Sequence, residues 1–288
     1  MPNSPLAAPF ATRAVLQAHG LVLKKSLGQH FLVDDNIVGK ILALARIPAG
    51  AVVLEIGPGI GTLTVALCAA AGHVVAVERD ADLLPVLRDV ASGCGNLTIV
   101  PADAVTVPIT ALAAPAGMPE ALVANLPYGV AATVVLRLFQ EMPSLLSATV
   151  MVQSEVADRM AASPGRKDYG AYTVKLRLLA EPAGRFQVPS TCFMPPPRVD
   201  SAVLRLDRVS RPEPAELLEA AAALADAAFA QRRKTIRNSV LASTGWSGAT
   251  FDEALAAAGI DGRRRAETLS VDEYVTLARE VGLLGLRD

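Results

Sequence analysis

Short apolar runs recur along the first half of the chain and alternate with segments long enough to form helices. The runs are rich in Val, Ile, Leu and Ala, and they cover residues 52–56, 74–78, 97–101, 121–125 and 148–153. Their apolar character is nearly continuous, which is typical of strands buried on both faces. Strands that alternate with helices indicate a mostly parallel sheet with helices on its faces. We therefore predict an α/β fold, and a helical pattern over residues 35–45 precedes its first strand.

The pattern near residue 175 fits two kinds of element. Tyr172, Val174, Leu176 and Leu178 alternate with polar residues, which indicates a strand by its period. Residues 178–180 also continue a helical pattern, so a helix remains open here. Residues 201–206 have a clearer strand pattern.

The composition changes after Pro212 and Pro214, where long helical patterns begin. Residues 215–241 contain no Gly or Pro and predict one long helix. Capping-box sequences start at Thr250 and Ser270, each ahead of another helical pattern. These patterns predict a small helical domain at the end of the chain.

These patterns predict a division of the chain into three parts. Residues 1–22 are rich in Pro and Ala and are expected to form a flexible lead-in with one short helix. Residues 23–210 hold the predicted sheet, and residues 211–288 hold the helical domain. The boundary is placed at the prolines that follow residue 209.

The composition narrows the class of protein. The chain has 288 residues, a net charge of −1 and 52% hydrophobic residues, so it can bury a sizeable core and carries no overall basic charge for nucleic acid. Its three cysteines, Cys68, Cys94 and Cys192, lack the spacing of a zinc site or a disulfide framework. We expect a cytoplasmic protein with no metal, no signal peptide and no membrane partner.

The segment Glu55-Ile56-Gly57-Pro58-Gly59-Ile60-Gly61 follows the first predicted strand and precedes a helix. Glycines let a backbone turn tightly and approach a ligand, and a helix N-terminus favours an anionic group. The Gly-x-Gly-x-Gly spacing differs from that of dinucleotide sites, which favours S-adenosylmethionine over NAD. Glu78 ends the second predicted strand, where its carboxylate could accept from ribose hydroxyls, and Asp103 follows the third, where it could accept from an adenine amine. The alternative is an ordinary tight connection between a strand and a helix.

The segment Asn125-Leu126-Pro127-Tyr128 ends the fourth predicted strand, at the sheet edge where open α/β sheets bind ligands. An aromatic amine is a poor nucleophile because its lone pair is delocalised into the ring. The Asn125 side-chain carbonyl and a backbone carbonyl near Leu126 could hold both amine hydrogens, while Tyr128 stacks on the base. These residues predict methyl transfer to the amino group of a nucleobase, and the alternative is a turn that ends a strand.

Two further features bear on a nucleic-acid substrate. Phe193 precedes a run of prolines and could form a second wall of a base pocket, or it could be a buried residue after a proline-rich connection. Basic residues occur in groups at Lys24-Lys25, Arg166-Lys167, 231–238 and 263–265. Each group alone is typical of a solvated face, but together they favour a basic surface for RNA phosphates.

The chain resembles the small-subunit ribosomal RNA adenine dimethyltransferase family. The resemblance runs from Lys24 to Asn238 and rests on an ordered set of motifs: Lys25-Ser-Leu-Gly-Gln-His-Phe-Leu32, Glu55-Ile-Gly-Pro-Gly-Ile-Gly-Thr-Leu-Thr64, Asn125–Tyr128, Gln153–Arg159, Phe193–Ser201 and Gln231–Ser239. It implies a class I methyltransferase domain with a mostly parallel seven-stranded sheet whose last strand is antiparallel, followed by a helical domain that binds RNA. It also implies S-adenosylmethionine contacts at His30, Leu32, Gly57, Glu78, Asp103 and Asn125.

The resemblance implies a specific substrate as well. Two adjacent adenines in a hairpin loop near the 3′ end of small-subunit rRNA would each be dimethylated at N6, within an immature 30S-type particle. The protein would act in small-subunit assembly and be a monomer away from the ribosome. We expect Asn125, Leu126, Tyr128 and Phe193 to serve the methyl transfer, and Glu55 and Gly59 to join the cofactor contacts.

Two departures and two rivals accompany this interpretation. The family often has Asn in place of His30, and Asn-Ile-Ser in place of residues 129–131. One rival is an adenine methyltransferase of large-subunit rRNA that confers macrolide resistance. The other is a non-catalytic assembly or transcription factor with the same fold.

Overall fold

The computed structural model describes residues 3–21 and 30–285 of the chain. Contacts between residues divide the described parts of the chain into two compact units. The first unit comprises the described parts of Met1–Ala157 together with Pro182–Arg208. The second comprises Asp158–Glu181 and the described part of Val209–Asp288. The motif residues Lys24–Gln29, including the basic pair Lys24-Lys25, lie outside the described residues.

A seven-stranded sheet forms the centre of the first unit, in the order β4-β3-β2-β5-β6-β9-β7. The strands of this sheet are β2 (Val52–Ile56), β3 (His73–Glu78), β4 (Leu97–Pro101), β5 (Ala121–Asn125), β6 (Ser147–Gln153), β7 (Ala180–Val188) and β9 (Ser201–Arg208). Pairing is parallel from β4 through β6 and antiparallel between β6 and β9. The predicted mostly parallel sheet and its antiparallel last strand are therefore confirmed.

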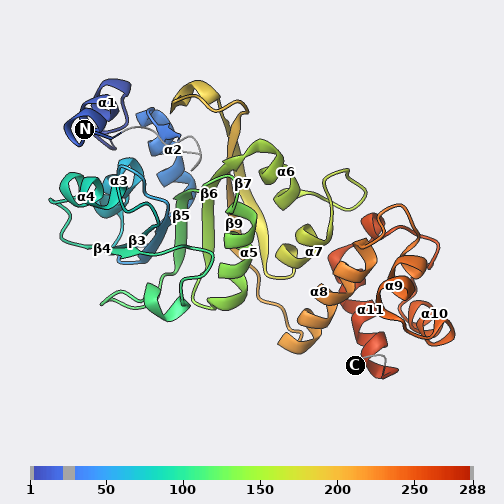
Figure 1. Ribbon diagram of the computed structural model, residues 1–288. Helices are drawn as coiled ribbons and strands as arrows, with labels where there is room; N and C mark the ends of the chain where they lie inside the picture. Colours follow the sequence, from blue (N-terminus) through green and yellow to red (C-terminus); the bar gives the residue numbers. More distant parts are fainter. Residues whose placement is uncertain (1–2, 22–29, 286–288) are drawn as a thin grey trace. The chain divides into compact units, whose positions relative to one another are not determined.

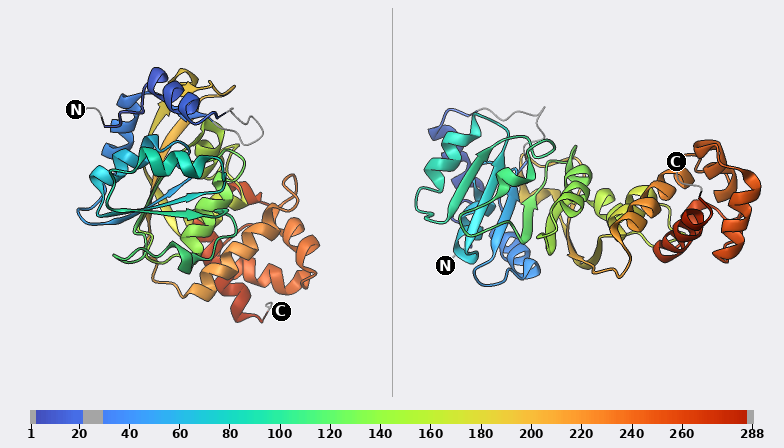
Figure 2. Two further views of the ribbon diagram at one scale, coloured as in Figure 1. Left: turned by 60° about the vertical axis from the view of Figure 1, so that its left-hand side comes forward. Right: turned by 90° about the horizontal axis from the view of Figure 1, so that it is seen from below.

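Helices lie on both faces of this sheet (Figures 1 and 2). They are α1 (Pro9–Ala18), α2 (Asp35–Ala45), α3 (Thr62–Ala70), α4 (Leu83–Val90), α5 (Ala131–Glu141) and α6 (Ser154–Ala161), the last of which crosses into the second unit. Successive crossovers from β2 lead to β3 and β4, whereas those from β5 lead to β6 on the other side. The strand order thus reverses between β2 and β5, and open α/β sheets bind ligands at the carboxyl ends of strands beside such a point.

The lead-in predicted as flexible packs against the first unit over residues 3–21. Leu16 of α1 is 8% exposed and lies in a core cluster with Phe31 and Ile60. The backbone amides of Asn3 and Ser4 donate to the Asp35 carboxylate at 3.1 and 2.8 Å. Apolar side chains of this segment are thus buried and part of its backbone is hydrogen-bonded, while its flexibility stays a prediction.

The second unit is helical, as predicted for the end of the chain. Its helices are α7 (Ala171–Arg177), α8 (Ala215–Phe229), α9 (Ile236–Thr244), α10 (Gly248–Ala257) and α11 (Val271–Leu283). The predicted capping box at Ser270 is confirmed, whereas α10 begins at Gly248 rather than after Thr250. The single helix predicted over 215–241 is broken, because the Thr235 hydroxyl accepts from the Asn238 amide and starts α9.

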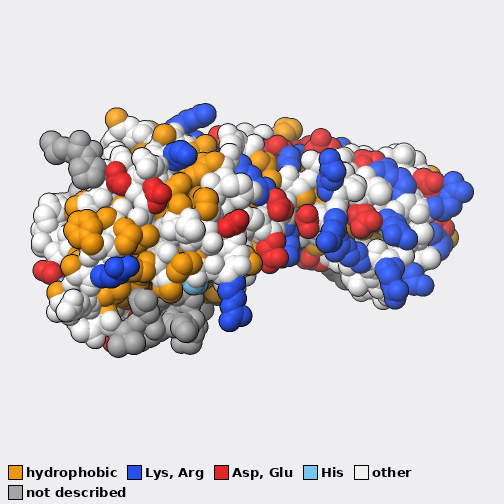
Figure 3. All heavy atoms as spheres, turned by 90° about the horizontal axis from the view of Figure 1, so that it is seen from above, with side chains coloured by type: hydrophobic (Ala, Val, Ile, Leu, Met, Phe, Trp, Pro, Cys, Tyr) orange, Lys and Arg blue, Asp and Glu red, His pale blue; other side chains and the backbone are white. Residues whose placement is uncertain are grey.

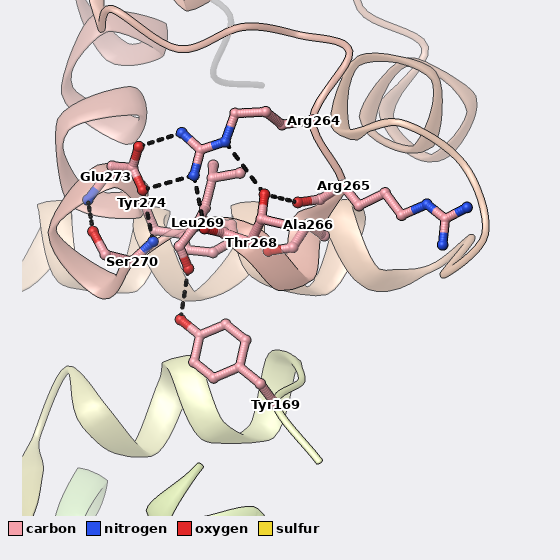
Figure 4. Close-up of polar contacts among 9 residues, drawn as sticks. All are labelled: Tyr169, Arg264, Arg265, Ala266, Thr268, Leu269, Ser270, Glu273 and Tyr274. Atoms are coloured by element: carbon pink, nitrogen blue, oxygen red, sulfur yellow. Dashed lines mark hydrogen bonds and ion pairs between the residues drawn. The ribbon is translucent and has the colours of Figure 1, made fainter. Parts of the chain in front are cut away.

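One segment assigned from sequence to the sheet domain packs with the second unit instead. Tyr169 is fully buried in the helical core, and its hydroxyl donates to the carbonyl of Leu269 at 2.9 Å (Figure 4). Val174 of α7 lies in the same core, so residues 171–177 form a helix and not the strand that their alternation favoured. The predicted boundary at 210/211 lies close to only one of the three crossings between the units, the last one at 208/209, and residues 158–181 belong with the C-terminal helices.

Candidate active site

A cavity of about 450 Å³ opens at the carboxyl ends of β2, β3, β4 and β5. Its wall is formed by the segments that directly follow these four strands, together with His30 and Phe31. Of the site residues predicted from sequence, those that line it are His30, Gly57, Gly59, Glu78, Asp103, Asn125, Leu126 and Tyr128. The fold thus gathers in one place most of the residues that were singled out for cofactor binding and methyl transfer.

The glycine loop after β2 has a backbone conformation that requires glycine. Gly57 and Gly59 have φ values of 68° and 61°, in the left-handed region. A Cβ atom on Gly57 would lie 3.3 Å from Cδ of Pro127, and one on Gly59 would lie 3.1 Å from Cε1 of Phe31. The loop leads into α3, whose N-terminus has no side-chain cap. Its free amide groups suit the carboxylate of a methionine-type cofactor.

Glu78 holds the same loop from β3. Its Oε2 accepts from the Gly59 amide at 3.2 Å, and its Oε1 accepts from the Asp80 amide at 2.7 Å. The side chain is largely buried, and burial raises the pKa of Glu78 above its usual range. The carboxylate faces the cavity with its direction already set, which fits the predicted contact to ribose hydroxyls.

Asp103 lies after β4 and is held by two donors. Its Oδ1 accepts from the Val105 amide at 2.8 Å, and its Oδ2 accepts from Nη1 of Arg79 at 3.1 Å. The Val105 amide and the Arg79 guanidinium keep the pKa of Asp103 below its usual range. The side chain is therefore an anionic acceptor at neutral pH, as a contact to an adenine amine requires.

Glu55 lies behind the cavity wall. It is 1% exposed, and its Oε2 has no hydrogen-bond partner among the described residues. Burial, with a smaller effect of the Glu78 carboxylate, raises the pKa of Glu55 to about 8. The side chain is thus mostly neutral at pH 7. Glu55 is not among the residues that line the cavity, and its contact to the cofactor stays a prediction.

Asn125 is the last residue of β5, and its amide is oriented by a backbone group. Its Nδ2 donates to the carbonyl of His30 at 3.3 Å. A carbonyl oxygen only accepts, so the nitrogen must face His30 and Oδ1 must point to the other side. No described residue donates to Oδ1, so this oxygen is free to accept from a ligand at the cavity.

The next residues are fixed by the neighbouring strands. The Leu126 amide donates to the Met151 carbonyl at 3.0 Å, which extends the pairing of β5 with β6 by one residue. The Tyr128 hydroxyl lies 2.9 Å from Oγ of Ser201. The ring of Tyr128 stacks with that of His30 at a centroid distance of 5.8 Å and an interplanar angle of 23°. Burial raises the pKa of Tyr128, so its hydroxyl keeps its proton at neutral pH.

Leu32 and Phe193 lie in the core and are not among the residues that line the cavity. They pair across two short strands, β1 (Phe31–Leu32) and β8 (Phe193–Met194), and both are buried in one core cluster. The Phe193 side chain is 2% exposed and does not line the cavity. Phe193 is therefore a buried residue in this structure, and its role as a second wall of a base pocket stays a prediction.

Several wall residues were missed from sequence. Phe31, Arg79 and Pro127 line the cavity. Each adjoins a residue that was singled out, and position next to a strand end is the signal that could have found Arg79 and Pro127. Phe31 offers no such signal, because its place depends on the pairing of β1 with β8.

Two other kinds of feature are absent from the described ranges, 3–21 and 30–285. No group of three or more His, Cys, Asp or Glu side chains is placed there to hold a metal ion. No helix within those ranges has the length and apolar character needed to cross a membrane.

The strand order, the glycine loop and the acidic residues at the ends of β3 and β4 define a class I S-adenosylmethionine-dependent methyltransferase. The family model for ribosomal RNA adenine dimethylase matches residues 20–282. The chain therefore belongs to the ribosomal RNA adenine dimethylase family, for which S-adenosylmethionine is the methyl donor.

Relatives and solved structures agree with this family. The chain is 44% identical over 285 residues to ribosomal RNA small subunit methyltransferase A of Pelotomaculum thermopropionicum, covering 95% of this chain and 96% of that protein. It is 44% identical to the protein of the same name from Magnetococcus marinus, with 92% and 94% covered. The structure of the 23S rRNA methyltransferase ErmE is similar with a TM-score of 0.67 and 29% identity, over 88% of this chain and 99% of that one. A dimethyladenosine transferase from Plasmodium falciparum shares the fold with a TM-score of 0.71 at 23% identity, over 89% and 98%.

Proposed function

We propose that this protein uses S-adenosylmethionine to dimethylate the N6 amino groups of two adjacent adenines in a hairpin loop near the 3′ end of small-subunit rRNA. The observation that carries the proposal is Asn125, whose Nδ2 is held by the His30 carbonyl and whose side chain lines one cavity together with the glycine loop, Glu78 and Asp103. The full-length similarity to proteins named ribosomal RNA small subunit methyltransferase A supports the choice of RNA.

The chemistry follows from the positions of the acceptors. The Asn125 carbonyl and the backbone carbonyl of Leu126 accept from the two amine hydrogens and turn the nitrogen lone pair out of conjugation with the ring. When bound, S-adenosylmethionine supplies an electrophilic methyl group on a sulfonium. With the donor held by the glycine loop, Glu78 and Asp103, its methyl group would pass from sulfur to N6 with the sulfur keeping the bonding electron pair, and the N6 proton would leave to water. Alignment of reactants can supply roughly 7–11 kcal/mol of the barrier reduction.

The chain's own residues hold the two reactants. Glu78, Asp103 and the glycine loop at Gly57 and Gly59 bind the cofactor, and His30 closes the cavity beside them. Tyr128 stacks on the base, which must leave its helical stack to reach a cavity of this kind. Glu55 is buried near the end of β2, two residues before Gly57.

The second unit is assigned to RNA binding. Backbone hydrogen bonds join three of its segments. The Gly165 amide donates to the Glu267 carbonyl, and the Ile236 amide donates to the Arg264 carbonyl. These segments carry cations that have no ion pair among the described residues, namely Arg166, Lys167, Arg233, Lys234 and Arg265, and all five are exposed. Lys and Arg side chains are spread over the face of this unit drawn in Figure 3. Unpaired surface cations suit RNA phosphates.

The setting of the reaction is part of the proposal. The protein acts in the cytoplasm on an immature 30S-type particle, contributes to small-subunit assembly, and is a monomer away from the ribosome. Its substrate includes the folded RNA of that particle, which the second unit contacts through phosphates.

Two rivals predict different products. The large-subunit enzyme ErmE is similar over nearly the same length, but at 29% identity against 44% for the small-subunit relatives. A non-catalytic assembly factor would not need a free acceptor at Asn125 or paired carboxylates in the cavity. We therefore favour the proposed function over both alternatives.

The test uses labelled S-adenosylmethionine and small ribosomal subunits that lack the methyl groups, with large-subunit RNA in parallel. We expect N6,N6-dimethyladenosine at two adjacent small-subunit adenines, identified by mass. Label in large-subunit RNA alone would favour the ErmE-like activity. Tight binding without label would favour an assembly factor.

A further inference from the structure

Ser201 contacts the hydroxyl group of Tyr128 but is not among the residues that line the cavity. Its Oγ lies 2.9 Å from the Tyr128 hydroxyl, and this hydrogen bond joins residues 73 positions apart in the chain. Ser201 itself is fully buried, with 0% of its surface exposed. A buried hydroxyl of this kind exchanges little with water, so the contact restrains the end of the Tyr128 side chain.

The strand that carries Ser201 is held firmly. Ser201 is the first residue of β9 and pairs with Gln153 at one end of the β6–β9 ladder, whose other end pairs Ser147 with Asp207. Just before it, the Asp200 carbonyl accepts from the Ser154 amide at 3.1 Å. The serine hydroxyl is therefore a fixed point, whereas Tyr128 lies in a turn after β5.

A second contact reaches Tyr128 from the same neighbourhood. The His30 ring stacks on Tyr128, and His30 Nδ1 lies 2.7 Å from the Pro195 carbonyl. Because a carbonyl only accepts, Nδ1 carries the proton in this contact. The segment 193–201 thus restrains Tyr128 twice, through His30 at its ring face and through Ser201 at its hydroxyl.

We propose that Ser201 is a positioning residue for methyl transfer, because it fixes the tilt of the Tyr128 ring on which the target adenine stacks. The inference rests on the proposed function. His30 covers one face of the ring, so the base takes the other face, and the tilt of that face sets the direction in which N6 meets Asn125.

The second methyl transfer is the step most sensitive to this tilt. The acceptor is then an N6-methyl amine, which has one hydrogen left for the acceptors and a bulkier nitrogen. With fewer hydrogen bonds to align the amine, stacking on Tyr128 must supply more of the orientation. Loss of the Ser201 contact should therefore release or misalign the monomethylated adenine.

The test compares Ser201→Ala, Tyr128→Phe and the double variant with wild type. Each single change removes one partner of the hydrogen bond and keeps the tyrosine-sized ring. Ser147→Ala is the matched control, because it is the same change at a buried serine at the opposite end of the β6–β9 ladder. The readouts are kcat, the KM for S-adenosylmethionine, and the ratio of N6-methyl- to N6,N6-dimethyladenosine at equal conversion.

We expect Ser201→Ala and Tyr128→Phe each to lower kcat about three- to tenfold, the range that one hydrogen bond supports. Both should raise the monomethyl to dimethyl ratio with an unchanged KM for the cofactor. The double variant should match the single variants, since only one hydrogen bond is lost. Ser147→Ala should behave as wild type.

A wild-type ratio and kcat in Ser201→Ala, or additive effects in the double variant, would overturn the assignment. If Ser201→Ala does not fold, Tyr128→Phe decides alone, and a wild-type product ratio in that variant overturns it. A wild-type protein that leaves small-subunit RNA unmethylated would instead overturn the proposed function, on which this assignment depends.

Discussion

Single side chains at the site are oriented by backbone groups before any ligand is considered. The His30 carbonyl accepts from the side-chain nitrogen of Asn125. The amides of Gly59 and Asp80 donate to the two carboxylate oxygens of Glu78. Asp103 is held in the same way by the Val105 amide. Groups fixed in this manner need little reorganisation when reactants bind, which is the main source of electrostatic catalysis in preorganised sites.

Glu55 makes a prediction about pH at this scale. Its pKa is about 8 in the folded protein against 4.5 for an ordinary Glu, so the folded state holds the extra proton between these values. The stability of the wild type should therefore fall as pH rises through this window, by up to about 1.4 kcal/mol per pH unit. Glu55→Gln, which stays neutral, should lack this fall. Denaturant unfolding from pH 5 to 9 measures the difference.

The control for this prediction is Glu120→Gln, which changes an exposed carboxylate in the same unit. It should keep the pH profile of the wild type. Parallel profiles for wild type and Glu55→Gln would contradict the account of a buried, protonated Glu55.

At the scale of elements, the buried strands were the easiest part of the fold to predict. β2, β4 and β5 match the predicted ranges, and β3 and β6 each begin one residue earlier. β2, β3, β5 and β6 are buried along most of their length and β4 is half-buried at the sheet edge, so the sequences of all five strands are mostly apolar. By contrast, β7 (Ala180–Val188) was not predicted, because exposed residues alternate along it and it contains a proline and a glycine. Its place at the sheet edge is a tertiary feature.

The site was predicted to the extent that it depends on strand ends. Glu78, Asp103 and Asn125 were found because each ends or follows a strand and chain topology brings these ends together. The pairing of β1 with β8, which buries Leu32 and Phe193, was not predicted because these segments are more than 150 residues apart. The Ser201 contact to Tyr128 was invisible for the same reason.

The glycine loop gives a prediction that concerns an element. Gly57→Ala forces a side chain into the left-handed region and brings its Cβ to 3.3 Å from Pro127. We expect a loss of about 1–3 kcal/mol in stability from the strain. Cofactor affinity should also fall, at least about tenfold for a displacement worth 1.4 kcal/mol, because the loop must move away from the Asn125–Tyr128 segment. Calorimetry with S-adenosylmethionine and thermal unfolding measure the two effects.

Gly50→Ala separates strain from contact. Gly50 has a φ of 79°, but a Cβ there would meet nothing within 4 Å. It should lose stability without losing cofactor affinity. Equal cofactor affinity in Gly57→Ala and wild type would contradict the assignment of this loop to the cofactor.

At the scale of the whole molecule, the two units carry separate parts of the proposed function. The cavity is built entirely from the first unit. The second unit has its own buried core and pairs many of its charges internally, as Arg264 does with Glu273 (Figure 4). A net charge of −1 for the chain therefore does not describe the surface that meets RNA, which depends on the cations left unpaired.

Because the cavity and the proposed RNA-binding surface belong to different units, we expect substitutions on that surface to change RNA affinity without changing cofactor affinity. Replacing Arg233 and Lys234 with Gln should weaken RNA binding and reduce its salt dependence, by about 0.7–0.9 in the slope of log affinity against log salt for each lost phosphate contact. Affinity for S-adenosylmethionine should not change. Arg263→Gln is the control, because its guanidinium is exposed but already paired with Asp261 at 2.9 Å. An unchanged salt slope in the double variant would contradict RNA binding by this surface.

The most direct test of the account is the single-turnover rate of Asn125→Ala on undermethylated small subunits, measured beside its affinity for them. Asn125 is proposed to act by orienting the adenine amine, a role that matters at the transition state and little in RNA binding. We expect the rate to fall by roughly 10²–10³-fold, as for loss of one preorganised polar contact, with RNA affinity nearly unchanged. Methyl transfer near the wild-type rate would contradict the central claim.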